Sequence, residues 1–173
     1  MPLEIGTKAP NFALTAHDGS TWELEHYNGR VRVLLFYPQN ETLVCTKQLC
    51  SVRDNWSEYL ATNAEIVGIS ASTPEENLAF AESRRLPIPI LADPGRKYTA
   101  VYGKHWLFPL FATRAIVVVD DKGIVRTSRA MLRAFRPNDA DVIRAIYEAR
   151  GDLLEAKYRS MRSRLKEIKE KRV

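Results

Sequence analysis

One stretch of the chain decides its fold and its chemistry: it runs from Phe36 to Cys50 and reads FYPQNETLVCTKQLC. It continues an apolar run that begins at Val31, passes through a polar turn and enters a helix pattern that Thr42 can cap. Both cysteines of the chain lie in this stretch, at positions 45 and 50. A cysteine in the first turn of a helix meets unpaired N–H groups and the positive end of the helix dipole, which favour the thiolate. The stretch therefore predicts a reactive Cys45, followed by a Cys50 that is close enough to capture its oxidised form.

Outward from this stretch, apolar strand patterns alternate with helix patterns. The run at 31–37 predicts a strand at the centre of a sheet that is covered on both faces, and those at 64–70 and 114–119 predict two further core strands. Helices are predicted from Thr42 to about Leu60, from Thr73 to about Arg85 and from Pro137 to about Arg150. Shorter elements complete the pattern: an edge strand at 7–14, a strand at 21–24, an extended segment at 86–91, a short helix up to Tyr102 and a hairpin strand at 124–128. This alternation predicts a layered α/β domain with a partly parallel sheet over residues 1–150.

The last part of the chain, residues 151–173, is predicted to form a separate basic amphipathic helix. Eight basic and two acidic side chains lie between Lys157 and Val173, so a chain with a net charge of +5 has a nearly neutral body. Apolar residues recur there at spacings of four and three, which is a short coiled-coil pattern: Leu154, Tyr158, Met161, Leu165 and Ile168. A solvated helix face is favoured first, a homodimer contact second and nucleic-acid binding last, because no aromatic side chains interleave with the charges for base stacking.

Composition bounds the class of protein and its compartment. The first residues lack the charged start and apolar run of a secretory signal, and no stretch approaches the roughly 18 apolar residues of a membrane span. We therefore expect a soluble cytoplasmic protein without membrane contact. Two cysteines in 173 residues are too few for a secreted disulfide scaffold. Three scattered histidines and a cysteine pair at this spacing make poor metal ligands, so neither a metal site nor a cofactor is predicted.

With these elements in place, the chain resembles a peroxiredoxin, most closely the Q type, which is also called bacterioferritin comigratory protein. Residues 6–14, GTKAPNFAL, look like the opening strand of that family. The other matches are Pro38, Thr42 and Cys45 to its Pro-x-x-x-Thr-x-x-Cys motif, Cys50 to the resolving position of the Q type, and Arg114 to its active-site arginine. The resemblance covers about residues 3–150. It implies a thioredoxin-like fold, with a central mixed sheet, helices on both faces and a C-terminal helical extension.

The resemblance also implies roles for the site residues. Cys45 would be the peroxidatic cysteine, whose thiolate attacks the O–O bond of a peroxide. Thr42 and the N–H groups at the helix start would hold the two oxygens while charge moves along the S–O–O line. Arg114 would donate hydrogen bonds to peroxide and thiolate together. Pro38, which lacks an N–H, would shield the pocket from water, and Gln48 would order the hydrogen bonds around it.

For the second cysteine, the resemblance implies a Cys45–Cys50 disulfide that thioredoxin or a similar dithiol reduces. Five residues of helix rise about 7.5 Å and turn roughly 140°, whereas a disulfide needs Cα atoms within about 6.8 Å. The two cysteines therefore cannot bond in an intact helix, and we predict that its first turns unwind on oxidation. Cys50 could instead be a spectator, with an outside thiol resolving Cys45, and Arg114 could instead pair with a carboxylate. Residues 43 and 44 are Leu-Val where Q-type proteins often have Pro-Gly, which leaves the peroxide preference open.

The favoured function is a thiol-dependent peroxidase that reduces hydrogen peroxide and small organic hydroperoxides. One alternative is a thioredoxin-like disulfide reductase. That group typically uses Cys-x-x-Cys and a proline before the strand that faces the thiols, whereas this chain has Cys-x4-Cys and Ala112-Thr113-Arg114. The other alternative is a non-catalytic binding module that uses the basic tail, which salt-dependent DNA binding without peroxide turnover would favour.

Overall fold

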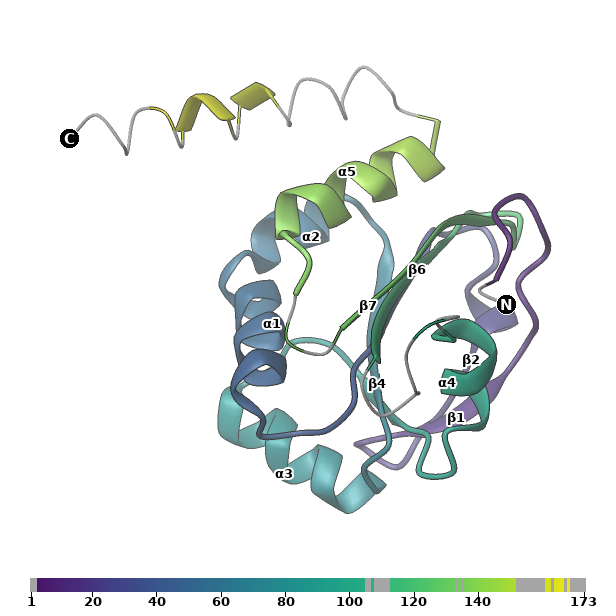
Figure 1. Ribbon diagram of the computed structural model, residues 1–173, viewed down its shortest axis with the longest axis vertical. Coiled ribbons are helices and arrows are strands. Elements are labelled where there is room, and N and C mark those ends of the chain that lie inside the picture. The colour runs from purple at the N-terminus through teal and green to yellow at the C-terminus, as the bar shows by residue number, and fades with distance from the viewer. Residues whose placement is uncertain are drawn as a thin grey trace.

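A mixed sheet forms the centre of the molecule (Figure 1). The computed structural model describes residues 3–104, 107, 113–132, 134, 136–151, 161–162, 164–166 and 168. Within these residues, seven strands form one sheet in the order β2-β1-β5-β4-β3-β6-β7. The strands are β1 (Ala13–Ala16), β2 (Thr21–Glu23), β3 (Arg32–Phe36), β4 (Glu65–Ser70), β5 (Ile90–Ala92), β6 (Thr113–Val119) and β7 (Val125–Leu132). β3, β4 and β5 are parallel and the other neighbours antiparallel, which confirms the partly parallel sheet.

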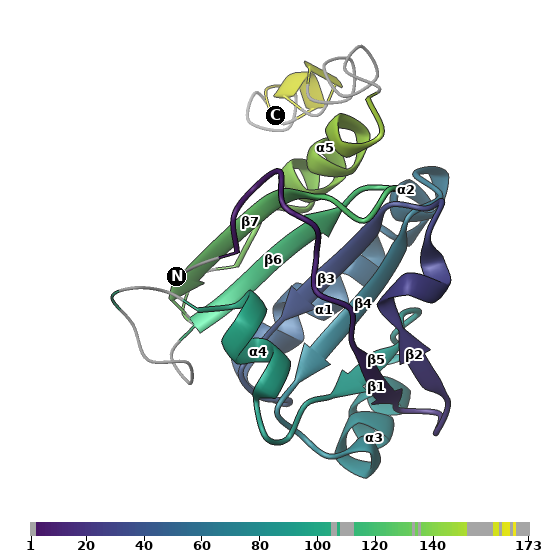
Figure 2. The same ribbon diagram turned by 90° about the vertical axis from the view of Figure 1, so that its right-hand side faces the viewer.

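Helices cover both faces of this sheet, which also confirms the predicted layers. They are α1 (Leu43–Asp54), α2 (Trp56–Ala61), α3 (Pro74–Arg84), α4 (Lys97–Tyr102) and α5 (Asp139–Ala149), together with a 3-10 turn, η1 (Leu24–Tyr27). α1, α2, α3 and α5 lie on one face, and α4 lies on the other (Figures 1 and 2). We call these the α1 face and the α4 face.

β3 is buried from end to end because both faces are covered. Val33 and Leu35 belong to the core of the α1 face, whereas Leu34 and Phe36 belong to that of the α4 face. All four are at most 1% exposed. Full burial of one such side chain contributes about 1.5–3 kcal/mol, so this strand fixes the centre of the fold.

The helix that follows β3 begins where the sequence predicts and ends earlier. Thr42 has an extended backbone, and its Oγ1 accepts a hydrogen bond from the N–H of Cys45 at 3.4 Å, so it caps α1. The predicted continuous helix to Leu60 is wrong, since α1 ends at Asp54 and α2 begins at Trp56. Asn55 lies between them with φ −104° and ψ 21°, and its side chain donates to the carbonyl of Ser51 at 3.0 Å. An asparagine that bonds the backbone in this way competes with the helix.

The predicted edge strand at 7–14 is also wrong for most of its length, because β1 begins only at Ala13. Lys8 makes an isolated bridge with Ile124, and the N–H of Ala9 donates to the carbonyl of Gly123 at 2.9 Å. Pro10 has no N–H with which to continue a ladder. The segment instead crosses the α4 face from the side of β7 towards β1, as the purple ribbon in Figure 2 shows.

The described residues of the C-terminal stretch lie beyond α5, on the side away from the sheet (Figure 1). Met161, Leu165 and Ile168 are helical there and are 57%, 52% and 50% exposed. Leu154 and Tyr158, which belong to the same predicted pattern, lie outside the described residues. No helix in the described part of the chain combines the length and the apolar character that a membrane span requires.

Candidate active site

The candidate site forms where β3, α1 and β6 meet. After β3 the chain passes through Pro38, which is half-buried, and re-enters the body as α1, so Cys45 is the third residue of that helix. β6 runs antiparallel to β3, with Ala115 opposite Phe36. Arg114 precedes Ala115 on β6. It therefore lies beside the end of β3 that leads into the loop before α1. Pairing of strands distant in sequence thus brings a guanidinium to the cysteine.

A buried arginine contacts both the thiol and a glutamine. Arg114 Nη2 lies 3.1 Å from Cys45 Sγ, and Arg114 Nη1 donates to Gln48 Oε1. The three residues are each at most 2% exposed. A guanidinium stays protonated in a protein, so the sulfur meets a full positive charge without competing water. This arrangement places a cation and the N-terminus of a helix against the Cys45 sulfur, so negative charge that develops there during a reaction is stabilised.

The predicted site residues divide into those that contact one another and those that lie nearby. Thr42, Cys45, Gln48 and Arg114 are joined by hydrogen bonds, whereas Pro38 and Cys50 stand outside this group. Both cysteines are free thiols, and Cys50 is half-buried in the same unbroken helix as Cys45. The two cysteines thus lie five residues apart in one intact helix, as the unwinding prediction assumes. The unwinding itself stays a prediction.

A buried polar chain behind the site escapes sequence reasoning. The hydroxyl of Tyr37 donates to Asn40 Oδ1 at 2.7 Å, and Asn40 Nδ2 donates to Asn77 Oδ1 at 2.8 Å. Ser70 Oγ donates to the same Asn77 oxygen at 2.9 Å. Burial raises the pKa of Tyr37, so its hydroxyl remains a donor. These bonds tie the loop between β3 and α1 to α3 and β4. Among these residues, the only sequence signal is a polar Asn77 on the apolar side of a helix pattern.

The same loop has a second link to α3. Glu41, just before the helix cap, has a left-handed backbone with φ 59°, which is uncommon for a residue other than glycine. Its carboxylate lies 2.9 Å from Arg84 Nη2, and both side chains are about half exposed. Exposed ion pairs add little stability. This one nevertheless orients a residue whose backbone sets the entry of the chain into α1.

The fold and the site together define a thioredoxin-like α/β protein with a buried, arginine-paired thiol. A model of the AhpC/TSA family matches residues 5–128, and the chain belongs to that family. It is 41% identical over 126 residues to a protein named Peroxiredoxin Q, chloroplastic, from Triticum aestivum, covering 70% of this chain and 56% of that relative. The chain thus spans little more than half the length of that relative.

Mycobacterial relatives match over more of their own length. A protein named as a putative peroxiredoxin from Mycobacterium tuberculosis is 33% identical over 138 residues, which cover 76% of this chain and 88% of the relative. The crystal structure of peroxidoxin BcpB from the same organism superposes with a TM-score of 0.70 at 28% identity, covering 86% of this chain and 97% of that one.

Proposed function

We propose that the protein is a thiol-dependent peroxidase that reduces hydrogen peroxide and small organic hydroperoxides. The observation that carries this proposal is the buried contact of 3.1 Å between Arg114 Nη2 and Cys45 Sγ. Family membership supports the same chemistry. A thiolate held by a fixed cation away from bulk water is the arrangement that favours nucleophilic attack on a peroxide.

In the first step, the Cys45 thiolate attacks one peroxide oxygen. An S–O bond forms, the O–O bond breaks, and the departing oxygen takes up a proton to leave as water or an alcohol. The sulfur is oxidised to a sulfenic acid and the peroxide is reduced. Arg114 already contacts the sulfur, so its guanidinium is placed to stabilise the charge that develops along the S–O–O line.

Three further residues support this step in the proposal. Thr42 Oγ1 lies at the helix start and can donate its hydroxyl proton to a peroxide oxygen while it accepts from the Cys45 N–H. Gln48 Nε2 is buried and has no hydrogen-bond partner within the described part of the chain, so it is a donor available to an oxygen bound there. Pro38 brings no N–H to the rim, which limits the access of water.

In the second step, the Cys50 thiol attacks the Cys45 sulfenic acid, an S–S bond forms and water leaves. An intact α1 keeps the two sulfurs apart, so the first turns of α1 open to permit the bond. An external dithiol, thioredoxin or a similar protein, then reduces the exposed disulfide by thiol exchange. Closely similar amide exchange at residues 43–52 in the reduced and oxidised protein would contradict this opening.

The deciding experiment is hydrogen peroxide consumption with thioredoxin, thioredoxin reductase and NADPH. We expect turnover by the wild type and none by Cys45→Ser or Cys50→Ser, with a sulfenic acid trapped at Cys45 in the second variant. A wild type that reduces protein disulfides but not peroxide would support the reductase instead. Turnover that persists in Cys50→Ser would show that an outside thiol resolves Cys45.

We also propose that residues 151–173 form an assembly element and pair with a second copy of the chain. Met161, Leu165 and Ile168 support this, since they are exposed at helical spacing. Sedimentation should give a dimer for the wild type and a monomer for Leu165→Glu. Equal masses for the two proteins would show that this helix does not hold a dimer together.

The compartment is a separate proposal. Two cysteines used for catalysis rather than as a structural disulfide suit a reducing compartment, and we propose the cytoplasm.

A further inference from the structure

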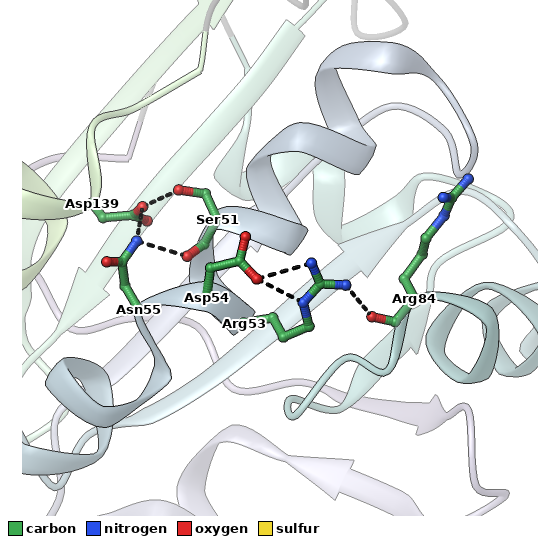
Figure 3. A network of polar contacts seen from close by, with 6 residues as sticks. All are labelled: Ser51, Arg53, Asp54, Asn55, Arg84 and Asp139. Carbon is green, nitrogen blue, oxygen red and sulfur yellow. Dashed lines mark hydrogen bonds and ion pairs between the residues drawn. The ribbon is translucent and has the colours of Figure 1, made fainter.

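One carboxylate joins α5 to the segment that directly follows the second cysteine. Asp139, the first residue of α5, accepts from the hydroxyl of Ser51, from Asn55 Nδ2 at 3.2 Å and from the hydroxyl of Tyr59 at 2.6 Å. The donors are spaced four residues apart, so they lie on one side of α1 and α2. Figure 3 shows Ser51 and Asn55 converging on Asp139. We call this arrangement the Asp139 clamp.

Hydrogen bonds to a charged group, together with a second tether, hold the clamped segment in place. A carboxylate that accepts several hydrogen bonds makes stronger contacts than neutral pairs do. Burial first, and the charge of Asp139 second, raise the pKa of Tyr59, so its hydroxyl keeps its proton and remains a donor. A second tether acts on the same segment, because Arg53 Nη1 donates to the carbonyl of Arg84 on α3 at 2.7 Å (Figure 3).

The clamp begins at the residue that follows Cys50. Before that point, α1 is held through side chains of the site itself: Cys45 and Gln48 contact Arg114, and Thr42 caps the helix. Of these contacts, only the one between Arg114 and Cys45 is made to the sulfur, which the reaction oxidises. The contacts of the Asp139 clamp involve no sulfur, so oxidation leaves them intact.

We propose that Asp139 is a positioning residue for disulfide formation and that it sets the boundary of the opening segment. Residues from Ser51 to Tyr59 stay folded against α5 while the turns before them open, so Cys50 remains in place and Cys45 travels to it. This inference rests on the proposed function, since it requires a Cys45–Cys50 disulfide. Local opening in units with fixed boundaries is a general property of folded proteins.

The boundary matters because the sulfenic acid has two competing fates. It forms the disulfide, releasing water, or it reacts with a second peroxide to give sulfinic acid, which a thiol does not reduce. A fixed Cys50 presents a high local concentration of the second thiol. Without the clamp, opening extends through α1 and α2 and Cys50 loses its fixed position. Disulfide formation then slows, and a larger fraction of Cys45 is oxidised to sulfinic acid.

The test compares Asp139→Ala with Asp141→Ala. Both variants remove an acid from the first turn of α5, but Asp141 contacts Arg144 on its own helix at 3.2 Å rather than α1. After one equivalent of hydrogen peroxide, samples are quenched with an alkylating agent, and the sulfenic acid, disulfide and sulfinic acid are quantified by mass spectrometry. We expect sulfenic acid to form at the wild-type rate in both variants. Disulfide formation should slow at least about tenfold in Asp139→Ala alone, with a matching gain in sulfinic acid. The variant loses three hydrogen bonds to a carboxylate, and one bond to a charged group already corresponds to about tenfold.

A second readout follows the fold directly. In the wild-type disulfide form, amide exchange at residues 55–60 should stay slow, because the N–H of Asn55 bonds the carbonyl of Ser51 and those after it bond carbonyls further along. In oxidised Asp139→Ala it should become fast. Ser51→Ala, which removes one donor, should show a smaller change in the same direction and covers the case in which Asp139→Ala does not fold. Fast exchange at 55–60 in the oxidised wild type, or unchanged disulfide formation in Asp139→Ala and Ser51→Ala, would overturn the clamp. A wild type that forms no sulfenic acid would instead refute the proposed function.

Discussion

The α1 face and the α4 face of the sheet are packed by different kinds of side chain. The α1 face carries the thiol and its arginine among buried polar groups, each of which needs a partner. The α4 face carries a cluster of rings: Phe12 lies 5.6 Å from Trp22, 5.1 Å from Tyr98 and 5.5 Å from Tyr102 between ring centroids. Side chains alternate along β3 and β6, so neighbouring residues serve opposite faces. From this difference we expect that packing on the α4 face supports the fold without affecting the chemistry on the α1 face.

The largest expected effect is on stability, from the α4 face. Phe12 is 2% exposed and contacts three rings, so Phe12→Ala leaves a cavity and should lower the free energy of unfolding by about 3–5 kcal/mol. The rate constant of the folded variant with hydrogen peroxide should remain that of the wild type. Urea denaturation and stopped-flow oxidation measure the two quantities. A large loss of rate in the folded variant would show that the two faces are coupled.

The next largest effect is on reactivity, from the α1 face. In Arg114→Lys the charge remains, but the fork that reaches both Cys45 and Gln48 is lost. We expect the second-order rate constant with hydrogen peroxide to fall about 100-fold, the loss typical for one preorganised donor. Arg129→Lys is the matched control, since Arg129 is exposed on the adjacent β7. Equal losses in the two variants would mean that the position of the arginine is irrelevant.

The sequence predicts the parts of the molecule that local patterns encode. The buried strand at β3, the cap at Thr42 and the start of α3 at Thr73 are confirmed, because each depends on a few neighbouring residues. The grouping of Cys45 with Arg114, 69 residues further on, came from the resemblance rather than from any periodicity.

What the sequence does not predict depends on partners far away in the chain. The break at Asn55 and the clamp at Asp139 are one such case, since the two side chains are 84 residues apart and neither belongs to a motif. The pair of Asn40 and Asn77 is another, at a separation of 37 residues. Hydrogen bonds of this kind follow from the tertiary arrangement, which propensity and period cannot specify.

A smaller effect on stability is expected at alkaline pH, from buried tyrosines on both faces. Burial raises the pKa of Tyr102 on the α4 face, and of Tyr37 and Tyr59 on the α1 face, above the ordinary value of 10.0. Above pH 10 the unfolded chain releases these protons while the native protein keeps them, so stability falls as the pH rises. Each tyrosine should remove about 1.4 kcal/mol per pH unit.

Urea denaturation between about pH 9 and pH 11 measures this slope. Tyr102→Phe should reduce it by the share of one tyrosine. The same substitution should leave peroxide reactivity at neutral pH unchanged, because Tyr102 contacts the carbonyl of Pro10 and rings of the α4 face. An unaltered slope in Tyr102→Phe would mean that its hydroxyl already ionises in the folded protein.

The smallest effect probes how finely the α1 face is tuned. Gln48→Glu has the same shape, but it places a carboxylate on the guanidinium that contacts the thiol. The added negative charge offsets part of the charge of Arg114 and repels the thiolate, so the rate with hydrogen peroxide at neutral pH should fall by less than about tenfold. Gln39→Glu adds the same charge on an exposed residue of the preceding loop and should change the rate little. Equal losses in the two variants would assign the effect to net charge, and no loss in Gln48→Glu would mean that the carboxylate leaves the hold of Arg114 on the sulfur intact. A loss confined to Gln48→Glu would show that a neutral residue at this position leaves the full positive charge of Arg114 to act on the sulfur.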